Sequence, residues 1–143
     1  MFCRRSASRS ARWGLRHLAL AALLVAGLVP AAAAERGFPF DRELRLDANP
    51  MKGSKRVPIL GIGPKGETSI DLWCNSVKAQ IVVDDDTITI MTGAKTERQC
   101  PPERMRGDEE LLAALLAATG WRRDGSLLTL RGARTVRFRL GTN

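Results

Sequence analysis

The stretch TSIDLWCNSVKAQIVVDDDTITIMT, residues 68–92, decides what kind of fold this chain can build. Apolar and polar residues alternate through much of it, which is the two-residue period of a half-buried strand. Three consecutive aspartates at 84–86 separate two strand-like runs and predict a hairpin turn. This part of the chain therefore predicts antiparallel β-structure with one face turned toward a core.

The alternation continues on both sides of this stretch. Residues 42–48 alternate, and the apolar run at 56–63 contains a proline that limits it to an edge or a strand start. Near the C-terminus, the runs at 126–132 and 135–141 predict a last hairpin.

The period changes in GDEELLAALLAATG, residues 107–120, which predicts one amphipathic helix. Asp108 is the expected N-cap, and Gly120 is the expected stop. Leu111 and Leu115 lie on one stripe of this helix. One helix among several strands with short connections predicts an α+β fold with a strongly curved, mainly antiparallel sheet.

The N-terminus has the pattern of a secretory signal peptide. A basic start precedes the apolar run LALAALLVAGLV at 18–29, and small residues lead to a cleavage site after Ala34. The apolar run is shorter than the ~20 residues of a spanning helix. The sequence predicts a cleaved segment at 1–34 and one mature domain at 35–143, with a weakly ordered lead-in at 35–40. It leaves open whether export is general secretory or twin-arginine.

Cleavage changes the charge of the product. The full chain has 23 basic and 15 acidic residues, and five arginines but no acid leave with the signal peptide, so the mature net charge is 18 − 15 = +3. Such a mild charge does not predict nucleic-acid binding. His17, the one histidine, also leaves. Without histidine, the mature chain shows no triad, no activated nucleophile and no metal set, so we expect no enzyme activity, no cofactor and no metal.

Two cysteines remain after cleavage: Cys74 in DLWCNSV and Cys100 in TERQCPPER. In an exported chain the default is a disulfide. Closing a loop of about 27 residues stabilises the folded state by roughly 3 kcal/mol in the chain-entropy model. The alternative, a thiol nucleophile, has no histidine to activate it.

Three other features have both a structural and a functional interpretation. GIGPKG at 61–66 matches a nucleotide-binding pattern, but a strand-like run follows it, so a glycine-rich hairpin turn is predicted. The aspartates at 84–86 fit a solvated turn better than a cation loop. Trp73 and Trp121 are expected in the core, Trp121 packing back on the helix; for Trp73, exposure for ligand contact is the alternative.

Four arginines of the predicted last hairpin form a candidate basic face. Charged side chains are common on exposed edge strands, where they block edge-to-edge pairing. The functional interpretation is a surface for an anionic partner. The residues are Arg131, Arg134, Arg137 and Arg139, with Arg137 and Arg139 expected to point outward.

The order of LWCN (72–75), TERQC (96–100), an acid-led apolar helix and a terminal hairpin resembles the META-domain family, the HslJ-like heat-shock proteins of bacterial envelopes. The resemblance covers roughly residues 57–140. It implies a barrel-like sheet with a helix and an envelope location, and it implies no enzyme activity. The residues that match are Cys74, Asn75, Thr96, Cys100, Glu109 or Glu110, Leu112, Leu115 and Leu128 to Leu130.

These observations together predict a non-enzymatic, periplasmic or secreted envelope domain that contributes to stress tolerance through binding. The expected partner is an unidentified envelope protein or an anionic surface component, and we expect a monomer that meets the membrane only through its signal peptide. The first alternative is an inhibitor of a lysozyme or protease that uses a loop at 49–55 or 101–107. The second alternative is a small carrier of apolar ligands.

Overall fold

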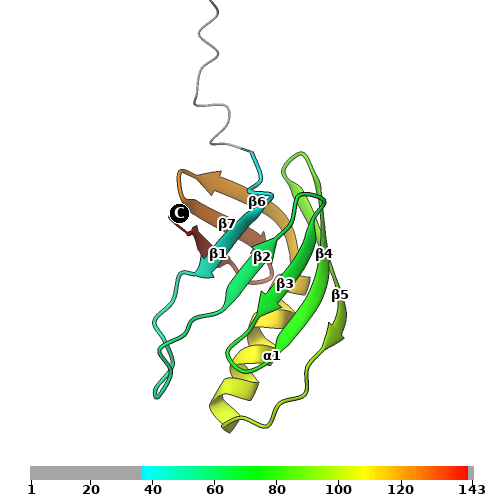
Figure 1. Cartoon of the computed structure of the whole chain (residues 1–143). Coiled ribbons are helices and arrows are strands. Elements are labelled where there is room, and N and C mark those ends of the chain that lie inside the picture. Colours follow the sequence, from blue (N-terminus) through cyan, green and yellow to red (C-terminus); the bar gives the residue numbers. More distant parts are fainter. Residues whose placement is uncertain (1–36, 142–143) are drawn as a thin grey trace, which may run out of the picture.

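The computed structural model of the chain describes residues 37–141, where eight strands and one helix form a closed antiparallel barrel (Figure 1). The predicted signal peptide at 1–34 lies outside the described residues. Strands adjacent in sequence pair with one another, and β8 returns to pair with β1. This arrangement confirms the α+β fold with a strongly curved sheet. The elements are β1 (Arg42–Leu46), β2 (Ile59–Ile62), β3 (Glu67–Asp71), β4 (Ser76–Asp84), β5 (Thr87–Lys95), α1 (Pro102–Leu116), β6 (Ala118–Asp124), β7 (Leu127–Gly132) and β8 (Val136–Leu140).

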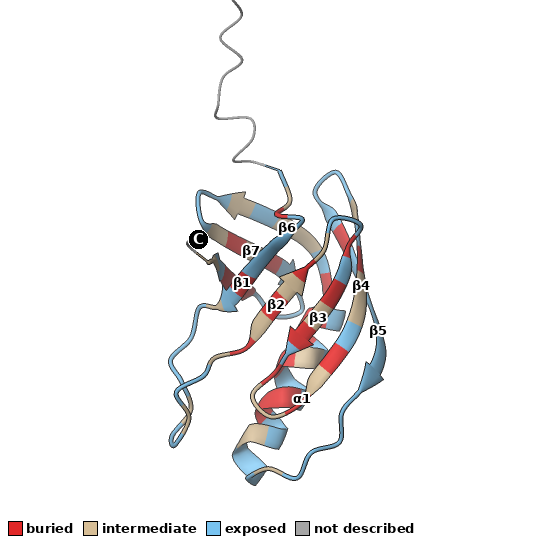
Figure 2. Cartoon of the chain, viewed as in Figure 1, coloured by how far each residue is buried: buried red, intermediate tan, exposed pale blue. Residues whose placement is uncertain are grey.

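The barrel interior is packed with large apolar side chains, which Figure 2 shows as alternating buried positions along the strands. This alternation is what the two-residue period predicts for a sheet with one face on a core. The most deeply buried side chains include Leu44, Leu60, Ile70, Val77, Leu115, Leu128, Leu130 and Phe138.

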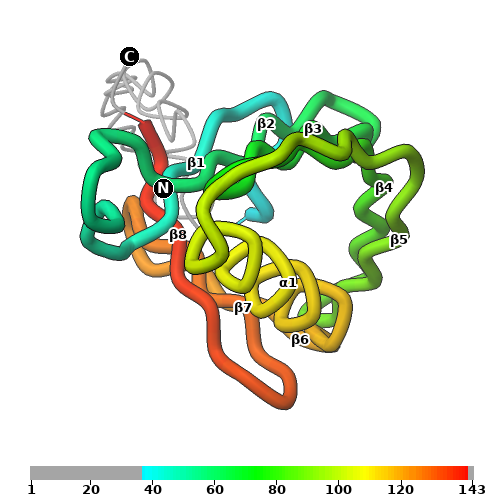
Figure 3. The backbone as a smooth tube through the Cα atoms, turned by 90° about the horizontal axis from the view of Figure 1, so that it is seen from below, coloured from blue at the N-terminus to red at the C-terminus, as the bar shows by residue number. Residues whose placement is uncertain are grey.

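The helix packs against the barrel where two neighbouring strands, β5 and β6, share the fewest paired residues. Strand β5 pairs with β6 through a single Cα pair, Thr87 with Gly120. Beyond that pair α1 packs against β5, and Leu111 and Leu115 are buried in the core. Figure 3 looks at this end of the barrel and shows α1 lying across it. The predicted leucine stripe therefore has the core as its partner.

The helix limits at 107–120 are wrong at both ends. Helix α1 begins at Pro102, whose fixed φ suits a first helical position and whose missing N–H would have no partner there. It ends at Leu116, because the chain then enters β6, where Gly120 pairs with Thr87 and Arg131. Gly120 is therefore a strand residue and not a helix stop.

The glycine-rich motif at 61–66 ends β2 and forms the turn to β3 with residues 63–66, so the predicted hairpin turn is confirmed. The Gly63 N–H donates to the Glu67 carbonyl at 2.8 Å. Gly66 has a φ of +82°, and its carbonyl accepts a hydrogen bond from the Ile81 N–H at 2.8 Å. A Cβ at Gly66 would collide with the Ile81 carbonyl oxygen, which is rigid backbone. The position therefore requires glycine for its conformation and for its close contact.

We expect Gly66→Ala to destabilise the protein by about 2 kcal/mol, because it adds left-handed strain to a backbone collision. Urea unfolding followed by tryptophan fluorescence measures this change. Gly61→Ala is the matched control, since its Cβ would meet the Ser69 carbonyl at an ordinary 3.9 Å and its φ is not positive. Equal losses in the two variants would contradict the turn argument.

Trp121 is partly buried and packs against the core as predicted, but it lies on β6 and does not directly follow the helix, which ends at Leu116. Its ring meets Phe38 edge-on at 5.2 Å between centroids, and Phe38 packs against the core. The indole Nε1 donates to the Asp85 carbonyl at 2.9 Å. Trp121 thus fixes β6 to the β4–β5 turn, in which Asp85 has a φ of 52°.

Within residues 37–141, no helix combines the length and apolar character needed to cross a bilayer.

Candidate functional site

A buried polar network lies at the helix end of the barrel. Asp108, on α1, is 1 % exposed, and its carboxylate accepts hydrogen bonds from the backbone N–H groups of Cys74 and Asn75 at 3.0 and 2.8 Å. It also accepts one from Asn75 Nδ2 at 3.1 Å. Asp108 therefore anchors the β3–β4 connection to the helix. Its expected role as an N-cap is wrong, because the helix begins six residues earlier.

Asn75 extends this network to the segment that follows β5. Its Oδ1 accepts from Thr96 Oγ1 at 3.0 Å and from the Arg98 N–H at 2.7 Å. Thr96 Oγ1 in turn accepts from the Ser76 N–H at 3.0 Å. Three of the residues that carry the family resemblance, Cys74, Asn75 and Thr96, thus meet here, while the acid in the network is Asp108 and not Glu109 or Glu110.

A disulfide joins Cys74 and Cys100, with 6.2 Å between their Cα atoms. The predicted pairing is confirmed. The bond ties the β3–β4 connection to the residues just before α1. Hydrogen bonds and a covalent link therefore fix the same two segments.

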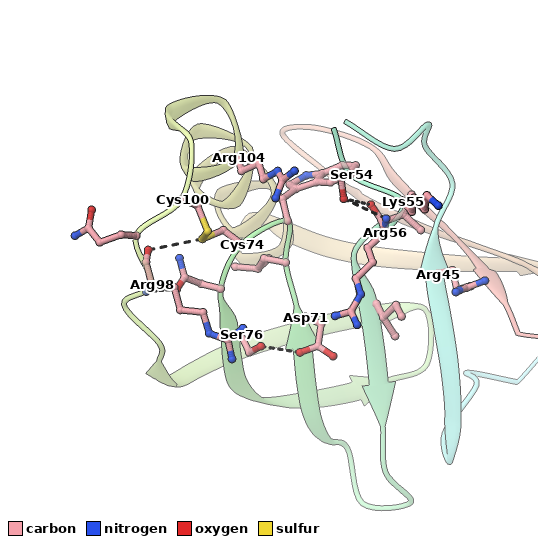
Figure 4. A pocket seen from close by; sticks show the side chains of 16 residues that line it. Arg45, Ser54, Lys55, Arg56, Asp71, Cys74, Ser76, Arg98, Cys100 and Arg104 are labelled. Carbon is pink, nitrogen blue, oxygen red and sulfur yellow. Dashed lines mark hydrogen bonds between the residues drawn. A yellow bond between two sulfur atoms is a disulfide. The ribbon is translucent and has the colours of Figure 1, made fainter. Parts of the chain in front are cut away.

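A groove of about 740 Å³ opens beside the disulfide. Figure 4 shows it between the β1–β2 loop on one side and the 98–104 segment on the other. Neutral polar side chains, Ser54, Ser76 and Gln99, line it together with charged ones. It is therefore an open polar groove, and the disulfide forms part of its wall.

The groove is strongly basic. One acid lines it, Asp71, which accepts a hydrogen bond from Ser76 Oγ at 2.7 Å. Figure 4 shows Arg56 reaching along the groove toward Asp71. Five cations against one carboxylate make the groove a candidate anion-binding site. These cations are Arg45, Lys55, Arg56, Arg98 and Arg104.

Arg104 also supports the groove structurally. Its Nη2 donates to the Gly53 carbonyl at 2.8 Å, which links α1 to the β1–β2 loop. Gly107, one turn further along α1, lies where a Cβ would come within 2.8 Å of Trp73 Cδ1. Trp73 is therefore half-buried against the helix while it lines the groove.

The four arginines predicted as one basic face do not all lie together. Arg137 and Arg139 point outward from β8 as expected, and Arg131 lies with Arg137 in a shallow depression of about 340 Å³. Arg139 Nε donates to Asp47 Oδ1 at 2.8 Å. Arg134 faces the helix instead, with Nη1 4.0 Å from Glu110 Oε2.

Sequence reasoning missed the basic groove. Its cations come from β1, the β1–β2 loop, the segment after β5 and α1. No periodic pattern links residues so far apart in the chain. The sequence feature that pointed nearest to the groove was the pair of segments predicted as inhibitor loops, 49–55 and 101–107. Residues from these segments line the two sides of the groove.

The fold and the groove define a disulfide-linked antiparallel β-barrel domain with one covering helix and a basic groove at one end. A family model described as "META domain" matches residues 43–142, and the chain belongs to this family. One similar solved structure, described as "NMR structure of the protein", has a TM-score of 0.55 and 19 % identity over 70 % of this chain and 89 % of that chain. This likeness supports the barrel fold alone. No curated protein matches the chain.

Proposed function

We propose that the protein is a non-enzymatic, exported domain of the bacterial envelope that binds an anionic partner in the basic groove and so contributes to stress tolerance. The observation that carries the proposal is the lining of the groove, where five cations face one carboxylate. Like charges held together on a rigid frame repel one another, and a bound anion relieves that repulsion. The signal-peptide pattern and the Cys74–Cys100 disulfide support the exported location.

The packed interior favours surface binding over transport of an apolar ligand. Phe138, Leu44 and Leu128 each have no exposed area inside the barrel. A carrier would have to displace such side chains, and opening a core of this density costs several kcal/mol, on the order of 3–5 per large side chain.

Inhibition of a secreted hydrolase is a second candidate function, because the β1–β2 loop protrudes from the barrel (Figure 1) and is held in place. The Ser54 N–H donates to the Met51 carbonyl at 2.9 Å, and Arg104 fixes Gly53. A loop held in one conformation loses little entropy on binding. Deleting residues 51–54 would abolish inhibition and leave the cations of the groove in the chain.

We expect the mature domain to bind inositol hexakisphosphate, a compact polyanion, and to lose at least about tenfold in affinity in the Arg56→Glu/Arg98→Glu variant. Isothermal titration calorimetry at two salt concentrations measures this, and added salt should weaken the binding. The variant keeps Arg104, which supports the loop.

The matched control is Arg42→Glu/Lys65→Glu, which changes the charge equally. Both residues are exposed at the opposite end of the barrel, since Arg42 pairs with Ile62 beside the β2–β3 turn that contains Lys65. An equal loss in both variants would mean that net charge, and not the groove, attracts the anion. Absence of binding by the unaltered domain would overturn the proposal for this class of small polyanion.

A further inference from the structure

The basic groove does not end at β1. Arg45, which lines the groove, is the Cα partner of Arg139 across the β1–β8 pair, and both side chains are exposed. Partners of this kind on one face have Cβ atoms about 4.5–5.5 Å apart, and like charges there are destabilising. Asp47 forms an ion pair with Arg139, and this contact reduces the repulsion between Arg45 and Arg139. The groove therefore continues directly into the arginines of the outer barrel wall.

The outer wall carries a second group of cations, the arginine wall, which consists of Arg122, Arg131, Arg137 and Arg139. Arg137 pairs with Thr129, and Thr129 pairs with Arg122, so these three residues form one row across β8, β7 and β6. Arg131 lies beside this row in the shallow depression. The wall extends over β6, β7 and β8, and Arg45 of the groove lies one strand further on β1, so the distance from β6 to β1 is three strand spacings, about 14 Å.

The charge of the described residues is divided unevenly. Residues 37–141 contain 17 basic and 14 acidic side chains, a net charge of +3. The groove and the arginine wall hold nine of the basic residues and three of the acidic ones, a net charge of +6. The rest of the described chain therefore carries eight basic and eleven acidic residues, a net charge of −3. The mild overall charge is therefore the sum of a basic groove and wall and an acidic remainder.

We propose that the groove and the arginine wall form one continuous track for an extended acidic polysaccharide. This rests on the proposed function and names the class of its partner. A compact anion can occupy the groove alone, whereas a chain is needed to reach the wall as well. Hydroxyl and amide groups of Ser54, Gln99 and Thr129 lie among the cations and suit sugar hydroxyls, while the cations suit the carboxylates.

The composition of the track favours a polysaccharide over a membrane or a nucleic acid. The exposed large apolar side chains, Phe40, Val82, Met91, Met105 and Leu116, line neither the groove nor the wall depression, so no apolar anchor for a bilayer lies there. Among the described residues that line these two sites, Trp73 is the one aromatic side chain. Stacking on several aromatic residues is the usual mode for single-stranded nucleic acid.

The test measures the affinity of the mature domain for oligogalacturonates of increasing length, from the disaccharide to the decasaccharide. We expect the decasaccharide to bind at least about tenfold tighter than the trisaccharide, because contacts at a second site on the same chain are intramolecular. Arg131→Glu/Arg137→Glu should remove this gain and leave binding of the trisaccharide unchanged. Arg56→Glu/Arg98→Glu should weaken both.

The outcomes separate this inference from the proposed function. Equal affinity for short and long chains, with inositol hexakisphosphate still bound in the groove, would overturn the track and leave the proposed function standing. Binding to vesicles with anionic lipid but to no oligosaccharide would overturn the polysaccharide as the partner. The Arg42→Glu/Lys65→Glu control should retain the full length dependence, and its loss would also contradict the track. Thermal melts of each variant confirm that it is folded.

Discussion

Replacing Asp108 with alanine is expected to destabilise the protein by about 4 kcal/mol, a larger effect than that of Gly66→Ala. The carboxylate is 1 % exposed and accepts hydrogen bonds from the N–H groups of Cys74 and Asn75 and from Asn75 Nδ2. Alanine would leave two buried donors and one partly buried donor without an acceptor. Asn75 would also lose its orientation toward Thr96 and Arg98. The hydrogen bonds that hold the segment before α1 would therefore be weakened as well.

Urea unfolding of the oxidised mature domain measures this effect. Glu109→Ala is the control, because it removes a neighbouring carboxylate on α1 that is exposed, and a change within about 0.5 kcal/mol is expected for such a site. Asp108→Asn should fall between the two, since it keeps one acceptor oxygen and turns an amide donor toward other donors. An Asp108→Ala variant as stable as the Glu109 control would show that the network does not hold the helix.

Removing the disulfide should lower stability by about 3 kcal/mol and the melting temperature by about 10–20 °C. Cys74 and Cys100 are 26 residues apart in sequence, so the bond closes a loop of moderate length. It joins the β3–β4 connection to the residues before α1, the same segments that Asn75 joins. In the unfolded chain the bond reduces the number of accessible conformations, and in the folded chain its two cysteines line the groove.

The measurement compares thermal melts of the oxidised domain, the reduced domain and the Cys74→Ser/Cys100→Ser variant. The reduced domain and the variant should melt at similar temperatures, and reducing agent should not lower the variant further. Mass spectrometry of exported protein should show a chain beginning at Glu35 that is two hydrogens lighter than the dithiol. An unchanged melt after complete reduction would count against the stabilising role, and two free thiols in exported protein would contradict the bond itself.

The alternating runs predicted a strongly curved antiparallel sheet because each of these strands turns one face to the core. Leu60 and Ile62 on β2, and Ile88 and Ile90 on β5, are buried as the two-residue period requires. The helix limits were predicted less well, because Asp108 has the side chain of a good N-cap and Gly120 that of a good stop. Long-range hydrogen bonds to Cys74 and Asn75 determine the position of Asp108, and pairing with Thr87 determines that of Gly120.

The basic groove shows the limit of sequence reasoning more clearly. Arg45 and Arg98 are 53 positions apart, and only barrel closure brings both to one groove. The sequence correctly predicted that the last hairpin carries four arginines, but the four do not form one face. Arg134 turns toward Glu110, while Arg131 and Arg137 line the same depression. The strand period predicts which face a side chain takes and not which neighbours it meets across the sheet.

The amino-acid sequence by itself determined seven of the eight strands, the presence of one amphipathic helix, the cysteine pair and the resemblance to the META-domain family, but not β6, whose residues 118–120 were assigned to the helix. These depend on local periodicity and on residue chemistry, which do not require knowledge of distant contacts. Only the tertiary structure decided the helix limits, the burial of Asp108 and the joining of the groove to the arginine wall. Each of these depends on which strands become neighbours when the barrel closes, and that is a property of the whole chain.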